Sequence, residues 1–216
     1  MNKTAILIDG AFYRNRAFSC LGDKSPSERA KELSEYCHKH LQNDQSLYRI
    51  FYYDCLPMNK KVFHPLLQKQ VDLGKSDIYN WGFAFIDELK HQRKFAIRLG
   101  KLAESQACYT LKTDTVKKLC RGKKILSDLQ ESDFQLNVAQ KGVDMKIGID
   151  IASLAFKKQV DQIILISGDS DFVPAAKLAR REGIDFVLDP LFAPIKPDLY
   201  EHIDGLRTCD HRFKPK

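Results

Sequence analysis

The feature that most constrains the fold is an apolar run, Ile163–Ile166, that passes directly into the acidic segment Ser167–Asp171. A short run of this kind, bounded by glycine and aspartate, predicts a strand buried on both faces, as in a parallel sheet. The N-terminus repeats the arrangement, because Ala5–Ile8 leads into Asp9. Ligands of open α/β sheets bind outside the carboxyl ends of the strands. Both acidic segments are therefore expected at one functional edge.

Strand-like and helix-like segments alternate along most of the chain. Aromatic and β-branched runs predict strands at residues 3–9, 47–53, 95–99, 162–167 and 184–188. Helical patterns, with Ser25 as a candidate cap of the first, predict helices at residues 26–42, 60–73, 76–93, 145–158 and 171–182. This βαβ series is typical of an α/β fold with a doubly wound, mostly parallel sheet of about five strands and helices on both faces.

We expect residues 1–216 to form a single domain, with two departures from the βαβ pattern. Residues from about 102 to 140 carry several lysines and an alternating segment at Phe134–Val138, which favours an inserted basic β-arm beside the sheet. A solvated basic loop and a substrate-binding arm fit this composition equally well. The C-terminal tail, residues 190–216, has three closely spaced prolines and is expected to be irregular.

Composition and missing motifs exclude several classes of protein. No apolar stretch reaches the roughly 18 residues of a membrane span, and a strand that starts almost at the N-terminus leaves no room for a signal peptide. Six scattered cysteines without a C-x-x-C pair favour a cytoplasmic protein with reduced thiols over a zinc site or a disulfide framework. The G-x-S-x-G elbow of serine hydrolases and the glycine-rich loops that cradle nucleotides are also missing.

The net charge of +7, from 35 Lys and Arg against 28 Asp and Glu, favours a polyanionic partner. Aspartates gathered into one metal site would leave the remaining surface more basic than this total indicates. Nucleic acid is the favoured partner, although anionic membranes and solubility alone account for many basic proteins. Tyr13 and Trp81 could stack on bases or fill the core, and the sequence leaves both alternatives open.

Three acidic segments are expected to meet at the carboxyl edge of the sheet: Asp9, the pair Asp169 and Asp171, and Asp144 with Asp150 on a helix. Most have a simpler explanation, since aspartate is favoured at helix N-caps and turns. Asp150 is the exception, because it borders an apolar helix face and needs a cation or a basic side chain to offset desolvation. Closely packed carboxylates repel one another unless a cation lies among them or one is protonated. The convergence predicts a site for a hard cation with oxygen ligands.

These segments resemble the three motifs of the NYN domain. The matching residues are Ile6–Gly10, Lys141–Asp144 followed by Asp150, and Ser167–Phe172 followed by Pro174 and Gly183. They extend over most of residues 3–190 and are similar to the LabA-like branch of the PIN-like nuclease superfamily. The resemblance implies a parallel sheet of strand order 3-2-1-4-5, a cluster of aspartates that binds Mg²⁺ or Mn²⁺, and hydrolysis of RNA phosphodiester bonds by an endoribonuclease.

Carried over residue by residue, the resemblance implies a set of acidic ligands that are also the catalytic residues. They are Asp9, Asp144, Asp169 and Asp171, with Asp150 as a further ligand or a neighbour of one. Side chains next to these carboxylates are candidates to contact nucleic acid, RNA in preference to DNA: Tyr13, Arg14, Arg16, Lys141, Ser167 and Ser170. Surface solvation explains the two arginines equally well.

The chain departs from the family pattern at one point. Many relatives have Asn shortly after the first Asp-Gly, whereas this chain has Ala11–Tyr13, and Asn15 is the nearest amide. A nucleic-acid-binding regulatory module with weak or lost nuclease activity is therefore an alternative. A phosphatase is disfavoured, because Ala11 stands where an aspartyl-phosphate mechanism needs a second aspartate. No membrane partner is expected, and association into a homo-oligomer is left open.

Overall fold

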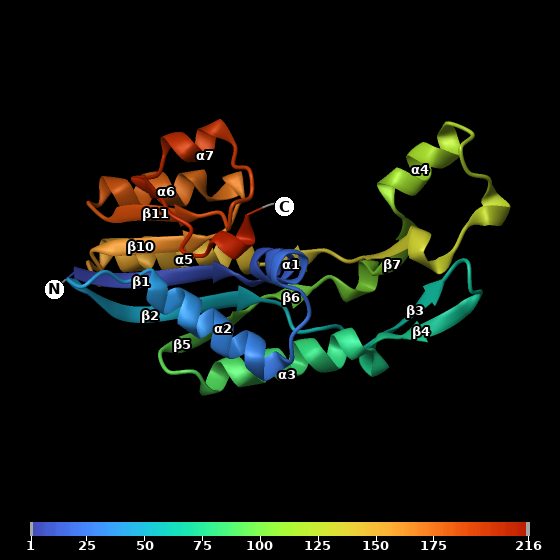
Figure 1. Ribbon diagram of the computed structural model, residues 1–216, viewed down its shortest axis with the longest axis horizontal. Coiled ribbons are helices and arrows are strands. Elements are labelled where there is room, and N and C mark those ends of the chain that lie inside the picture. The colour runs from blue at the N-terminus through green and yellow to red at the C-terminus, as the bar shows by residue number, and fades with distance from the viewer. Residues whose placement is uncertain (1, 215–216) are drawn as a thin grey trace.

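The computed structural model describes residues 2–214 and is built on one six-stranded parallel sheet (Figure 1). Its strands are β1 (Asn2–Asp9), β2 (Gln45–Asp54), β5 (Phe95–Leu99), β10 (Gln162–Ile166), β11 (Asp185–Asp189) and β12 (Gly205–Leu206). The order across the sheet is β12-β11-β10-β1-β2-β5, and every neighbouring pair is parallel. The expected five strands and their order 3-2-1-4-5 are confirmed, and β12 adds a sixth strand at the edge.

Helices cover both faces of this sheet, as predicted for a doubly wound fold. On one face lie α5 (Val143–Phe156) and α6 (Val173–Arg181), and on the other lie α1 (Gly10–Leu21), α2 (Pro26–Lys39) and α3 (Asp77–His91). Alternate residues of a strand point to opposite faces, so β1 sends Ala5 and Leu7 into the first core and Ile6 and Ile8 into the second. This two-sided burial explains the unbroken apolar runs of the central strands.

Local signals in the sequence explain where two of the helices begin. The Ser25 hydroxyl accepts a hydrogen bond from the Glu28 amide (3.3 Å), and the Glu28 carboxylate accepts one from the Ser25 amide (3.0 Å). This capping box, with Pro26 in the first turn, starts α2 where it was predicted. Helix α3 begins in the same way, because the Ser76 hydroxyl accepts a hydrogen bond from the Tyr79 amide (3.1 Å).

The helix predicted at residues 60–73 is wrong. The segment forms an antiparallel hairpin of β3 (Lys61–His64) and β4 (Lys69–Asp72), followed by the 3-10 turn η1 (Leu73–Lys75). In β3, Val62 and His64 are buried while Phe63 between them is exposed, which is the period of a strand and not of a helix. The buried His64 ring packs on Tyr109 and Phe134, at ring-centroid distances of 4.4 and 5.0 Å.

Residues 101–141 form an arm that projects from the sheet (Figure 1). The ladder of β6 (Lys101–Leu102) and β9 (Gln140–Lys141) closes its base. A second ladder joins β7 (Cys108–Leu111) to β8 (Phe134–Asn137), where the alternating segment predicted a strand. Beyond that ladder lie helix α4 (Thr113–Cys120) and the turns η3 (Leu126–Asp128) and η4 (Glu131–Asp133), and η2 (Glu104–Gln106) lies between the ladders.

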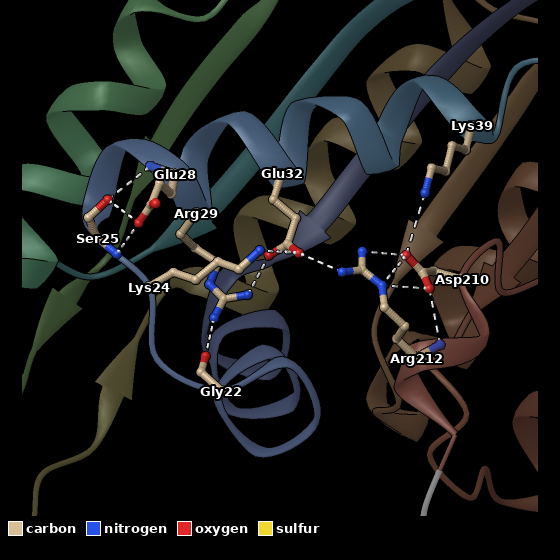
Figure 2. Close-up of polar contacts among 9 residues, drawn as sticks. All are labelled: Gly22, Lys24, Ser25, Glu28, Arg29, Glu32, Lys39, Asp210 and Arg212. Carbon is tan, nitrogen blue, oxygen red and sulfur yellow. Dashed lines mark hydrogen bonds and ion pairs between the residues drawn. The ribbon is translucent and has the colours of Figure 1, made fainter.

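The tail that was expected to be irregular is partly ordered into regular elements. Helix α7 (Pro197–Glu201) starts at a proline, which is tolerated in a first helical turn. Strand β12 and the turn η6 (His211–Phe213) follow. Figure 2 shows how η6 is held against α2: Arg212 pairs with Glu32 (3.4 Å), and Asp210 binds Arg212 (2.7 Å) and Lys39 (3.5 Å).

Two further properties bear on the expectations from composition. All six cysteines are free thiols; Cys37 and Cys55 are buried, while Cys108 and Cys120 are exposed on the arm. Among the helices described, none combines the length and hydropathy needed to cross a membrane.

Candidate active site

The carboxyl edge of the sheet gathers acidic side chains from adjacent elements. Asp9 ends β1, Asp54 ends β2, and Asp169 follows β10, the other neighbour of β1. Asp144 lies in the first turn of α5, and Asp171 lies in the turn η5 (Ser170–Phe172). Because parallel strands end at the same edge, these residues converge although up to 162 positions separate them in the chain (171 − 9).

Asp9 is both a helix cap and a member of this acidic group. One of its oxygens accepts a hydrogen bond from the Phe12 amide (3.1 Å), which starts α1, and the other accepts one from the Ser167 hydroxyl (3.4 Å). Burial raises the pKa of Asp9 to about 6; the Phe12 hydrogen bond opposes the rise, and the charges of Asp144 and Asp54 add to it. Asp9 can therefore be the cap of α1 and a member of the acidic group at the same time.

Glycine at position 10 lets α1 start this close to the sheet. A Cβ there would lie 2.6 Å from both the Tyr52 ring and the Tyr53 carbonyl oxygen. Gly168, on the opposite side of Asp9, faces the Phe12 ring, which a Cβ would meet at 3.0 Å. Both glycines therefore permit close approach, and neither needs a positive φ.

The other three aspartates form the second half of the group. Asp144 is not the cap of α5, because that position is held by Gly142 in a left-handed conformation with φ 80°. Burial raises the pKa of Asp144, and the charges of Asp169 and Asp171 raise it further. Asp169 caps η5 by accepting a hydrogen bond from the Asp171 amide (3.0 Å). Asp144 and Asp171 are thus left with carboxylates that hold no cap.

This set of donors suits a divalent cation with hard oxygen ligands. Burial and mutual repulsion disfavour the charged forms of Asp9 and Asp144, and a cation would relieve both effects. Within residues 2–214, no three of these carboxylates have ligand oxygens within 4.8 Å of one another. An ion would thus take few direct protein ligands and complete its shell with water, as Mg²⁺ commonly does.

A second acidic cluster does meet that closer spacing. Asp198, Glu201 and His202 of α7 and its C-cap bring three ligand atoms within 4.8 Å, in a solvent-facing position. His202 and Asp198 are 3.6 Å apart, one helical turn from each other. Such a group is common on protein surfaces without an ion, so a variant of this cluster is a suitable control for variants of the acidic edge.

Asp150, expected at the metal centre, is held elsewhere. Its carboxylate accepts hydrogen bonds from the Tyr53 hydroxyl (2.8 Å) and the Arg98 guanidinium (3.1 Å). Arg98 also lies over the Phe51 ring, 5.3 Å from its centroid. The sequence left either a cation or a basic side chain as the partner of Asp150, and Arg98 is a basic side chain of that kind. Through these two contacts Asp150 anchors α5 to β2 and β5.

Two residues expected to contact nucleic acid are structural instead. Tyr13 is buried in the core, where its hydroxyl has no hydrogen-bond partner among the described residues. Arg16 donates to the carbonyl oxygens of Leu191 (2.7 Å) and Phe213 (2.8 Å), which ties α1 to the tail. Tyr13 lies on the face of α1 that packs into the core, and Arg16 is partly buried against the tail.

The remaining candidates stay near the edge, in different roles. Ser167 is fully buried, donates to Asp9, and accepts from the Asp169 amide (3.3 Å), so it positions carboxylates. Ser170 accepts from Lys196 (3.0 Å). Lys141 is exposed on β9, two residues before α5 begins.

Asp54 is a residue of this edge that the sequence analysis did not place in the site. It is 1% exposed and accepts two hydrogen bonds from Arg14 (2.8 and 2.9 Å) and one from Tyr52 (2.9 Å). The signal was available, since an aromatic strand that ends in aspartate repeats the pattern of β1. The partner could not be found this way, because Arg14 comes from a helix 40 residues earlier.

An open groove runs beside the carboxylates, between α5 and α6. Its volume is about 400 Å³, and Asp144 and Asp171 form part of its wall. The remaining lining is mostly apolar, with Met145, Phe172, Pro174 and Leu178. Such a surface can take the sugar or base of a nucleotide whose phosphate lies at the acidic group.

Comparisons with known proteins bear on the family and the fold. A sequence model of the NYN domain matches residues 84–194, which include α5 and the acidic segment after β10. A crystal structure of VPA0982, a Vibrio parahaemolyticus protein of unknown function, shares the fold with a TM-score of 0.50 and 14% identity. That likeness covers 98% of this chain and 95% of the other. No curated protein matches the sequence.

Proposed function

Since the chain belongs to the NYN domain family, within the PIN-like superfamily, we propose that it is a divalent-metal-dependent nuclease that cleaves RNA internally. The observation that carries the proposal is the convergence of four carboxylates from three segments at the carboxyl edge of the sheet, with the pKa of Asp9 and Asp144 raised. The net charge of +7 supports a polyanionic substrate.

We assign Asp9, Asp144 and Asp169 as the residues that would hold Mg²⁺ or Mn²⁺, partly through water, because no three of their oxygens lie within 4.8 Å of one another in the described chain. When bound, such an ion lowers the pKa of a coordinated water and stabilises charge on the phosphate and the leaving oxygen. Asp171 binds through water or orients the attacking water, because its carboxylate is exposed beside Asp169. Ser167 holds Asp9 in place through its hydroxyl.

The basic side chains around the edge have separate roles in this proposal. Lys141, exposed three residues before Asp144, neutralises a phosphate oxygen of the substrate. Arg14 pairs with Asp54 within the edge, so that Asp54 adds no unpaired buried carboxylate to the group. The apolar groove between α5 and α6 receives the adjoining nucleoside.

The proposal is tested by cleavage of labelled RNAs and DNAs with Mn²⁺, Mg²⁺ or EDTA. Wild type is compared with Asp169→Asn and with Asp198→Asn, which disrupts the second acidic cluster on α7. We expect metal-dependent cutting of RNA that Asp169→Asn abolishes and Asp198→Asn leaves intact. Retained activity in Asp169→Asn would overturn the site assignment, and loss only in Asp198→Asn would move the metal to α7.

A second function is favoured by one specific observation. Many relatives have Asn shortly after the first Asp-Gly, whereas this chain has Ala11–Tyr13 there, and the Phe12 ring of this stretch lies on Gly168. The stretch therefore offers no side-chain amide to position a substrate. If the protein is a regulatory nucleic-acid-binding module, it will bind RNA in a salt-sensitive manner and show no turnover with any divalent metal.

A further inference from the structure

A pocket separate from the groove described above opens between α1 and α3. Helix α1 contributes Arg14, Asn15 and Phe18, and α3 contributes Ile78 and Trp81. Its volume is about 540 Å³, which is within the range of small-molecule sites. No role in the fold or in the proposed chemistry accounts for this pocket.

The aromatic wall of the pocket is held in a fixed orientation. Trp81 stacks on the buried Phe85 ring (4.9 Å between centroids, 20° between planes) and donates from Nε1 to the Lys24 carbonyl oxygen (2.8 Å). Phe18 packs against its side at 5.0 Å. A preorganised indole of this kind offers a stacking surface at little cost in side-chain entropy.

An exposed apolar side chain completes this wall. Ile78, in the first turn of α3, is 80% exposed, the largest value among the exposed large apolar residues of the described chain. In this position it can cover one face of a flat ligand that lies against Trp81.

The charges around the pocket favour a base over a phosphate. Arg14 is already bound by Asp54, and Lys24 is bound by Glu32 at 2.9 Å (Figure 2). The other two charged lining residues are both aspartates. They are Asp23 and Asp77, and within residues 2–214 neither makes a side-chain hydrogen bond or an ion pair.

Two carboxylates without a partner repel a phosphate and can accept hydrogen bonds from N–H groups. Amino groups on guanine, adenine and cytosine can supply such donors. Guanine supplies the most, because its ring N1–H lies next to its amino group, whereas uracil has a single ring N–H and no amino group. The Asn15 amide adds an acceptor and a donor at the same rim.

The pocket is continuous with the proposed catalytic edge through α1. That helix begins directly after Asp9, and at 1.5 Å per residue Arg14 lies about 8 Å and Phe18 about 14 Å along it. Arg14 links the two regions, because it lines the pocket and binds Asp54 of the edge. A strand of nucleic acid held at the edge therefore has a neighbouring base within reach of the pocket.

We propose that this pocket binds an amino-bearing nucleobase, guanine most tightly, from a nucleotide that flanks the bond cleaved at the acidic edge. The base stacks on Trp81 beneath Ile78, and its amino group donates to Asp23 or Asp77. Base recognition in this form rests on the proposed nuclease function, which supplies the polymer and its direction along α1.

The test uses Trp81 as its own probe, since it is the only tryptophan in the chain. The full-length protein in EDTA is titrated with GMP, AMP, CMP, UMP and ribose 5-phosphate while Trp fluorescence is recorded. We expect saturable quenching by GMP, weaker quenching by UMP, and none by ribose 5-phosphate. Ile78→Ser should raise the Kd for GMP at least five-fold. Ile149→Ser, the same change at a 59% exposed site on the other face of the sheet, should leave it unchanged.

Each opposing result has one meaning. Absence of quenching by any nucleotide, or equal affinity in Ile78→Ser, overturns the pocket assignment. Equal quenching by ribose 5-phosphate shows a phosphate site and overturns it as well. Because the titration contains no metal, failure of the nuclease proposal leaves this readout intact: nucleotides would still quench Trp81 although no metal supports cleavage. Cleavage without quenching refutes the pocket alone.

Discussion

Replacing Asp9 by Asn is expected to stabilise the metal-free protein at neutral pH, although it removes a proposed metal ligand. Burial raises the pKa of Asp9 from 3.8 to about 6. The folded protein therefore holds this proton more tightly than the unfolded chain, and at neutral pH it bears the cost of a charged, desolvated carboxylate. At 1.36 kcal/mol per pKa unit the cost is about 3 kcal/mol. We expect a gain of about 2 kcal/mol, because the side chain keeps part of its solvent contact.

The pH dependence follows from the direction of this shift. The folded state binds more protons than the unfolded state between pH 3.8 and about 6. The Asp9 contribution to stability therefore falls as pH rises through this window and stays low above it. The gain from Asp9→Asn should be full above pH 7, about half as large at pH 5, and small at pH 4. The variant amide still accepts the Phe12 N–H, so the cap of α1 is kept.

The measurement is urea unfolding of both proteins in EDTA at pH 7.5, 5 and 4. Asp87→Asn, an exposed aspartate on α3, is the control and should change the free energy of unfolding by less than about 0.5 kcal/mol. A less stable Asp9→Asn protein at pH 7.5 would refute the reasoning. So would a stability gap that does not change between pH 7.5 and pH 4.

Three further predictions concern the same edge of the sheet. Mn²⁺ at 1 mM should raise the Tm of wild type by about 3 °C or more and leave Asp169→Asn unchanged, as measured by thermal shift; equal shifts would place the ion elsewhere. Gly10→Ala should cost about 3 kcal/mol in urea unfolding, because its Cβ would meet the Tyr53 carbonyl oxygen at 2.6 Å; a cost under 1 kcal/mol would contradict this packing. Arg14→Ala should cost about 3 kcal/mol at pH 7.5, since it leaves Asp54 buried and unpaired. A loss below about 1 kcal/mol for Arg14→Ala would count against a stabilising role of the ion pair.

Much of the fold follows from local patterns in the sequence. Buried parallel strands are continuous apolar runs, so β1 and β10 were recognisable without any partner. The capping signal at Ser25 predicted the start of α2, and the helix predicted at residues 76–93 coincides with α3, which Ser76 caps. The hairpin at residues 60–73 was mistaken for a helix, because its strands are too short to distinguish the apolar period of a strand from that of a helix.

The acidic edge was predictable for a related reason. Parallel strands end on one side of a sheet, so aspartates that close such strands must converge wherever the strands are neighbours. The positions of Asp9 and Asp169 relative to their strands already contain this information. Asp144 joins them because α5 runs back over the sheet and begins at the same edge.

Partner choice was settled only by the tertiary structure. Asp150 pairs with Arg98, and Tyr13 packs into the core, because both outcomes depend on which elements lie against α5 and α1. The pocket between α1 and α3 joins residues more than 60 positions apart (81 − 14 = 67), whose spacing carries no local signal. Periodicity and capping act over a few residues and are written in the chain, whereas ion pairs and cavities form between distant segments and exist only once the helices have packed.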